Sequence, residues 1–270
     1  MSLVLLFGDS WARQSWYHDS TPTEYYYPHW SLSNTYVNNN IDDWFNQYIS
    51  NTCINFAEYG NTNSLIIQQL YNRTATISNI QQDINYIIFQ TDPLRIFAPR
   101  QDYTDKLLVW KNFQVWAQQN NFNWHNSSLN DLLDIIFKNF YQALIFFQKT
   151  AQQKFSDRSV KLYIIGGVSA LHKCIADYPL NIIHNSISNF LGLDQDLVFE
   201  NRSSLINFTH VWLDNISSTH KNILLDQWQE FENQLIKKEN FWINNPELFA
   251  GRHLTTKGIT TVANLINKTI

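Results

Sequence analysis

The sequence is poor in charge and in cysteine, and neither residue class forms an organised pattern. Charged residues make up 16% of the 270 residues, and the formal net charge is −4. Scattered basic residues on an acidic chain exclude the basic footprint of a nucleic-acid-binding surface. Cys53 and Cys174 lie far apart, which excludes a disulfide framework and the spacing of a cysteine metal site. We therefore expect two free thiols, no metal site and no nucleic-acid partner.

Long apolar runs are also absent. No stretch approaches the roughly 20 apolar residues of a membrane-spanning helix. The apolar run at residues 3–7 is too short for a signal peptide, and no basic segment precedes it. We therefore expect synthesis in the cytoplasm without a signal peptide and without membrane insertion. The Asn-rich, signal-free character also fits a virion-associated protein, which is the alternative.

The residues that are present predict a folded α/β domain. Hydrophobic residues reach 44% and aromatic residues 15%, which suffices for a sizeable core and argues against disorder. Short apolar runs typical of buried strands occur at 3–7, 53–57, 86–89 and 160–165, with a weaker candidate at 209–213. Helical patterns separate them at 41–50, 63–70, 129–155, 217–239 and 255–270. This alternation predicts a parallel sheet in one domain over residues 1–270, with insertions near 17–40 and 96–128.

The tripeptide Gly8-Asp9-Ser10 directly follows the first apolar run. The strand would end at Gly8, and a sharp turn would place Ser10 near the N-terminus of a helix. Backbone N–H groups at such a position can receive negative charge beside an exposed serine. An acyl-transfer nucleophile needs that arrangement. The same tripeptide also occurs in ordinary turns, so its position after the strand carries the hypothesis.

Three further features follow in chain order. Gly60 comes just after the second strand, Gln90-Thr91-Asp92 follows the third, and His253 precedes the last helix. Together with the first tripeptide, they resemble the SGNH (GDSL-type) hydrolases over nearly the whole chain. The resemblance implies a three-layer α/β/α sandwich with a five-stranded parallel sheet in the flavodoxin-like order 2-1-3-4-5. It also implies ester or acyl hydrolysis, no metal and no cofactor.

The resemblance assigns roles to individual residues. Ser10 would be the nucleophile, and its own N–H would be one donor to the oxyanion. Gly60 would supply a second N–H, because glycine lets the backbone approach the substrate oxygen; the alternative for Gly60 is a plain turn. His253 would be the general base that takes the Ser10 proton and returns it to the leaving group. His172, near the end of a strand, is a rival histidine that could line the pocket.

The third motif departs from the family pattern Gly-x-Asn-Asp. Asp92 matches its last residue, but no Asn precedes it. Thr91 or Gln90 could donate to the oxyanion in place of that Asn. Arg95 could assist as a cation, and a salt bridge on a helix face or loop is an equally good interpretation.

The fourth motif lacks its acid. The family places Asp three residues before the histidine, and here that position is Ala250. Losing the acid of a triad can cost about 10⁴ in turnover. Three explanations stay open: a Ser–His dyad oriented by a backbone carbonyl, Glu247 as a compensating acid, or an inactivating substitution at Ala250.

The aromatic residues suggest a substrate class. They gather after the nucleophile and in the second insertion, at Trp11, Trp16, Tyr17, Tyr25, Tyr26, Tyr27, Trp30, Trp110, Trp116 and Trp124. Aromatic faces stack on sugar rings and cover acyl chains, which predicts a serine esterase acting on a small-molecule or glycan ester, such as an O-acylated carbohydrate. The alternatives are packing of the insertions onto the domain, a non-catalytic glycan-binding or structural module, and a sugar O-acyltransferase.

Overall fold

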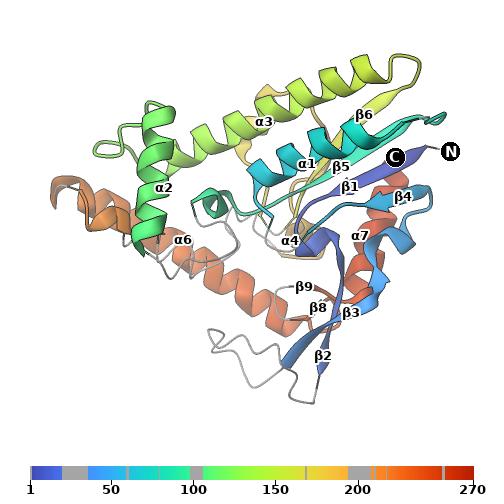
Figure 1. Ribbon diagram of the computed structural model, residues 1–270. Helices are drawn as coiled ribbons and strands as arrows, with labels where there is room; N and C mark the ends of the chain where they lie inside the picture. The colour runs from blue at the N-terminus through green and yellow to red at the C-terminus, as the bar shows by residue number, and fades with distance from the viewer. Residues whose placement is uncertain are drawn as a thin grey trace.

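The chain folds around a single parallel sheet, shown in Figure 1. The computed structural model describes residues 2–19, 36–58, 61–78, 80–97, 106–167, 169–193, 208–209, 211–216, 218–250 and 253–270. The five strands of the sheet are β1 (Leu3–Phe7), β4 (Thr52–Asn55), β5 (Ile84–Gln90), β6 (Val160–Gly166) and β7 (Asn181–His184). They lie in the order β4-β1-β5-β6-β7, and every neighbouring pair is parallel. The predicted fold class and the strand order 2-1-3-4-5 are confirmed.

The central strands consist mainly of apolar residues because both faces of the sheet are covered. In β1, the side chains of Leu3, Leu5 and Phe7 join the core on one face, and those of Val4 and Leu6 join the core on the other. This alternation follows from the two-residue repeat of a strand. Parallel sheets with helices on both faces therefore contain continuous apolar runs.

Helices pack on both faces of the sheet. Helices α1 (Asn63–Thr76) and α3 (Leu129–Lys154) cover the face that includes Phe7, while α7 (Thr256–Thr269) covers the opposite face. The start of each is capped: Thr62, Ser128 and Thr255 accept hydrogen bonds from backbone N–H groups of the first turn. Helix α6 (Ser218–Asn244) runs from the vicinity of α2 to β8, as Figure 1 shows. None of the helices in the described ranges is long and apolar enough to cross a bilayer.

One predicted strand is wrong, and one strand of the parallel sheet was not predicted. Of the weak candidate 209–213, the described residues are helical, and Trp212 packs into an aromatic cluster. The fifth strand is β7, at the edge of the sheet, where Ile183 is the only buried residue. An edge strand with one buried side chain has no apolar run, so the sequence carried no signal for it.

The helix predicted at 41–50 is also wrong. This segment holds the end of β3 (Tyr36–Trp44) and the short 3-10 helix η2 (Phe45–Tyr48). Strand β3 pairs with β2 (Gln14–Asp19) in an antiparallel ladder, which starts directly after the first turn. The first insertion therefore adds a two-stranded sheet, and its residues 20–35 lie outside the described ranges.

The second insertion carries α2 (Lys106–Gln119), which packs through an aromatic cluster. Phe113 is fully buried at the centre of this cluster. Its ring lies 5.1 Å from the ring of Phe208 and 5.4 Å from that of Trp212. Trp110, Trp116 and Trp124 pack against the same core. These tryptophans therefore hold the insertion onto the domain.

Candidate functional site

Ser10 lies at the carboxyl edge of the sheet, where β1 gives way to the 3-10 helix η1 (Ser10–Ala12). Asp9 caps this helix, and its Oδ1 accepts a hydrogen bond from the Trp11 N–H at 3.0 Å. Ser10 is the first residue of the helix, where an N–H has no partner within the helix itself. Its hydroxyl and a backbone donor therefore lie side by side at the strand-to-helix turn that the motif predicts.

Gly8 allows this turn to lie close against β5. A Cβ at position 8 would stand 2.8 Å from the Cβ atoms of both Ala12 and Phe89. Carbon atoms in contact are normally about 3.5–4.0 Å apart, so a side chain would push the turn away from the sheet. The position of Ser10 therefore depends on a glycine two residues before it.

His253 reaches Ser10 from the far end of the chain. Its Nε2 lies 2.9 Å from the Ser10 Oγ, within hydrogen-bond distance. His253 begins β9 (His253–Leu254), and Thr255 then caps α7 with its hydroxyl. The histidine is half-buried, held between a strand and the anchored start of a helix. The structure thus brings together the nucleophile and the base that the sequence predicts.

Ala250 lies beside His253, where the family acid would stand. Strand β8 (Phe249–Ala250) pairs with β9 antiparallel, and Ala250 is directly opposite His253. Paired residues in such a ladder have Cβ atoms about 4.5–5.5 Å apart on the same face. The Ala250 side chain is fully buried. The position that the resemblance would give to an acid is therefore directly opposite His253 and is occupied by a buried methyl group.

The structure gives no contact between the Glu247 carboxylate and His253. Glu247 is exposed, and its backbone carbonyl accepts a hydrogen bond from the Thr255 hydroxyl at 2.5 Å. This contact ties the loop before β8 to the start of α7. Glu247 therefore supports the segment that carries His253 through its backbone.

Asp9 is the centre of a buried polar network. Its Oδ2 accepts hydrogen bonds from the Thr91 hydroxyl at 3.0 Å and from the Arg95 Nη1 at 3.1 Å. The same Arg95 nitrogen donates to the Asn61 carbonyl at 3.1 Å. The Arg95 and Asp9 side chains are only 4% and 1% exposed. Thr91 and Arg95, which the sequence predicts to bind substrate, thus both bind Asp9, the residue next to Ser10.

Two asparagines complete the network, and the sequence reasoning did not select them. Asn61 donates to the Gly8 carbonyl at 2.9 Å. Asn63 exchanges two hydrogen bonds with the backbone of Thr91, at 3.1 and 3.2 Å. In a chain rich in Asn, one more Asn in a turn carries no distinct signal. Their position directly after the Gly60 motif was the signal that could have singled them out.

The other residues of the third motif also have structural partners. Asp92 caps the 3-10 helix η3 (Pro93–Ile96) by accepting from the Leu94 N–H at 2.8 Å. Gln90 donates to the Ala170 carbonyl at 2.6 Å and accepts from the Tyr141 hydroxyl at 2.7 Å. These contacts fasten the end of β5 to its neighbours.

His172, the rival histidine, belongs to a separate buried cluster. Its Nδ1 lies 3.2 Å from the Cys174 Sγ, and its Nε2 lies 3.5 Å from Asp134 Oδ1. Its ring stacks on that of Phe137 at 5.2 Å. Burial lowers the pKa of His172, against the opposing effect of Asp134, and burial raises the pKa of Cys174 to about 11. Both groups are therefore neutral near pH 7. This is expected of buried side chains with a structural role, and it is not expected of an activated thiol.

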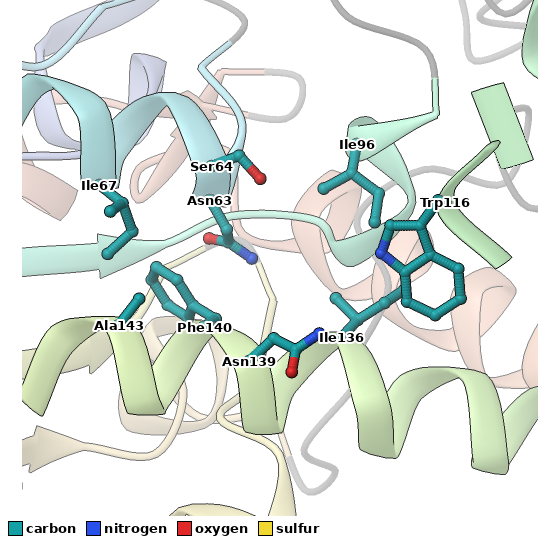
Figure 2. A pocket seen from close by; sticks show the side chains of 9 residues that line it. All are labelled: Asn63, Ser64, Ile67, Ile96, Trp116, Ile136, Asn139, Phe140 and Ala143. Carbon is teal, nitrogen blue, oxygen red and sulfur yellow. The ribbon is translucent and has the colours of Figure 1, made fainter. Parts of the chain in front are cut away.

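A cavity of about 270 Å³ opens between α1, α3 and η3, as Figure 2 shows. Uncharged side chains line it: Asn63, Ser64, Ile67, Ile96, Trp116, Ile136, Asn139, Phe140 and Ala143. Asn63 joins this cavity to the polar network through Thr91. Ser10 and His253 are not among the residues that line it, so this cavity does not enclose the Ser10–His253 pair.

Some of the predicted site residues lie outside the described ranges, and another packs in the interior. Gly60 and the aromatic residues Tyr25, Tyr26, Tyr27 and Trp30 are outside the described residues. Trp11 is fully buried, and its ring lies 5.8 Å from that of Trp242. Trp11 therefore packs in the core and offers no open face to a sugar.

In the described part of the chain, no cluster of His, Cys, Asp and Glu side chains has the arrangement of a metal site. No family model matches the sequence, and neither curated proteins nor solved structures include a match to the chain.

Proposed function

We propose that this protein is a serine ester hydrolase of the SGNH type, with Ser10 as nucleophile and His253 as general base. The observation that carries the proposal is the 2.9 Å contact between the Ser10 Oγ and the His253 Nε2. The sheet order and the turn after β1 place that pair at the carboxyl edge of a parallel sheet, where α/β proteins place their ligands. The resemblance of the motifs supports the same assignment.

In the first step, the Ser10 hydroxyl gives its proton to the His253 Nε2 while its oxygen attacks the acyl carbon of the ester. This step requires the neutral tautomer of His253 that carries its proton on Nδ1. The imidazolium then returns the proton to the leaving alcohol as the carbon–oxygen bond breaks. Water repeats the sequence on the acyl-enzyme, which releases the acid and restores Ser10.

The tetrahedral oxygen needs hydrogen-bond donors. The Ser10 N–H is one, and the resemblance assigns the Gly60 N–H as a second. The family's third donor is an Asn side chain, and Thr91 in that place already donates its hydroxyl to Asp9. One oxyanion donor is worth about 10²–10³ in turnover, so we expect a slower enzyme than a family member with all three donors.

Ala250 takes the place of the family's acid, so position 250 supplies no carboxylate to the pair. The β8–β9 ladder and the capped start of α7 hold the position of His253 without a carboxylate at 250. A dyad keeps the proton transfer but loses the charge that stabilises the imidazolium. We therefore propose that the substrate is a carboxylic ester that is easily hydrolysed, such as an acetyl ester. Trp11 is fully buried, and Trp110, Trp116 and Trp124 are partly buried against the aromatic core. Among them Trp116 also lines the cavity, whose lining includes neither Ser10 nor His253, so these residues give no direct support for a carbohydrate moiety at the pair.

A second candidate is a non-catalytic glycan-binding or structural module on the same fold. The fully buried methyl group of Ala250, in the slot of the acid, favours this candidate. A module of this kind would retain binding without turnover.

Hydrolysis of p-nitrophenyl acetate and labelling by a fluorophosphonate probe test the first proposal. We expect Ser10→Ala to abolish both, and His253→Gln to lower both by at least 100-fold. Matched controls are Ser156→Ala and His125→Gln, which change exposed residues far from the pair in sequence. Equal hydrolysis by the wild type and Ser10→Ala would refute the esterase. Glycan-array binding that Ser10→Ala leaves unchanged, in the absence of turnover, would support the binding module instead.

A further inference from the structure

We propose that Arg95 is a positioning residue, whose guanidinium fixes the nucleophile turn against the two neighbouring strand ends. This inference rests on the proposed function, because the group that it positions is Ser10. It gives Arg95 a different role from that of a cation that contacts the substrate. The contacts that carry it come from buried residues at the ends of β4, β1 and β5, which are adjacent in the sheet.

One nitrogen of Arg95 makes the decisive contacts. Nη1 donates to the Asp9 Oδ2 and to the Asn61 carbonyl, both at 3.1 Å. Asp9 belongs to the turn after β1, and Asn61 belongs to the segment after β4. Arg95 itself comes from η3, which follows β5. A single charged nitrogen therefore joins three strand ends.

Further hydrogen bonds close the same arrangement. The Gly8 carbonyl accepts from the Glu58 N–H at 3.2 Å and from the Asn61 side chain at 2.9 Å. Thr91 donates to Asp9 at 3.0 Å. The residues on both sides of Ser10 are thus held: Asp9 by Arg95 and Thr91, and Trp11 by the Asp9 carboxylate. Ser10 has little freedom to move while these bonds exist.

Stability alone is a poor explanation for this ion pair. A buried pair of charges is often no more stabilising than apolar side chains of the same volume, because both charges lose their hydration. What a buried pair does provide is geometry, since its bonds are strong and directional where water is excluded. A misplacement of about 1 Å in reacting groups can cost about 10²-fold in rate. An ion pair next to the nucleophile therefore has its clearest effect on catalysis.

The test compares three variants in kcat, KM, fluorophosphonate labelling and melting temperature. In Arg95→Lys, one ammonium can make both contacts, so we expect a loss of only a few-fold in kcat. In Arg95→Met, a side chain of similar length makes neither contact, and we expect kcat and the labelling rate to fall about 100-fold with KM nearly unchanged. Arg95→Met leaves the Asp9 charge uncompensated and is expected to melt earlier. The double variant Asp9→Asn/Arg95→Met removes both charges, so we expect it to recover melting temperature but not kcat.

The outcomes separate the two proposals. If labelling and hydrolysis depend on Ser10, and the double variant keeps the wild-type kcat, the positioning role is refuted while the esterase stands. If kcat in all variants only follows the fraction of folded protein, Arg95 is a structural residue and the inference is wrong. If the wild type and Ser10→Ala are equal in both assays, the esterase is refuted, and the positioning role is refuted with it.

Discussion

Ala250→Asp is the substitution that tests the proposed catalytic pair most directly. Ala250 faces His253 across the β8–β9 ladder, so a carboxylate at this position starts from a Cβ about 4.5–5.5 Å from the His253 Cβ. At a separation of about 4 Å and an effective dielectric constant of about 20, its attraction to an imidazolium is worth about 4 kcal/mol. That energy corresponds to about 10³ in rate, and desolvation of the new carboxylate reduces it. We expect kcat/KM for p-nitrophenyl acetate to rise between tenfold and 10³-fold.

The pH profile and two controls separate this mechanism from a general change in packing. A carboxylate beside His253 raises the pKa of the imidazole, so the acidic limb of the profile should move to higher pH. Ala250→Asn has the same shape without the charge and should gain less than Ala250→Asp. The double variant Ser10→Ala/Ala250→Asp should be inactive. A folded Ala250→Asp protein with no increase in kcat/KM, or an equal increase in Ala250→Asn, would refute the reasoning.

Three further predictions concern the turn, the histidine cluster and the aromatic core. In Gly8→Ala, the new Cβ would meet Ala12 and Phe89 at 2.8 Å, so we expect kcat to fall about 10–100-fold with KM little changed; a wild-type kcat would contradict this. Burial lowers the pKa of His172 from its ordinary 6.5, so the unfolded chain binds a proton more readily, and the free energy of unfolding falls as the pH drops below 6.5. His172→Asn should flatten that fall in urea melts at pH 7.5 and 5.5, and an unchanged pH dependence would count against it. Phe113→Ala empties the centre of the aromatic cluster and should cost about 3–5 kcal/mol in urea unfolding; a loss below about 1 kcal/mol would show that the cluster tolerates the cavity.

The fold was predictable where burial leaves a simple pattern. Strands β1, β5 and β6 are covered on both faces, and each therefore contains an apolar run that the sequence displays. The edge strand β7 buries only Ile183, so no run marks it. The opposite error occurred at 209–213, where Trp212 packs into the cluster around Phe113 and its apolar neighbours make the segment resemble a buried strand. Local apolar content reports burial, and it does not report which element is buried.

The candidate site was predictable in part, from the order of its motifs along the chain rather than from burial. Ser10 and His253 were selected from motif order, and the contact between them stays consistent with the predicted roles. The partners of Thr91 and Arg95 were not predictable, because hydrogen bonds between strand ends depend on side-chain positions in three dimensions. The sequence shows alanine three residues before His253, and only the ladder shows that Ala250 lies directly opposite it.

The separation of Ser10 and His253 along the chain also has a consequence for synthesis. The two residues are 243 positions apart in sequence. A ribosome adds about 5–20 residues per second, so roughly 12–50 s pass between the synthesis of one and that of the other. During that interval the turn with the proposed nucleophile lacks the proposed base, and the nascent chain has no complete Ser10–His253 pair. The proposed activity would therefore begin only after β9 and α7 have left the ribosome and packed against the sheet. The order of translation thus delays the onset of that activity.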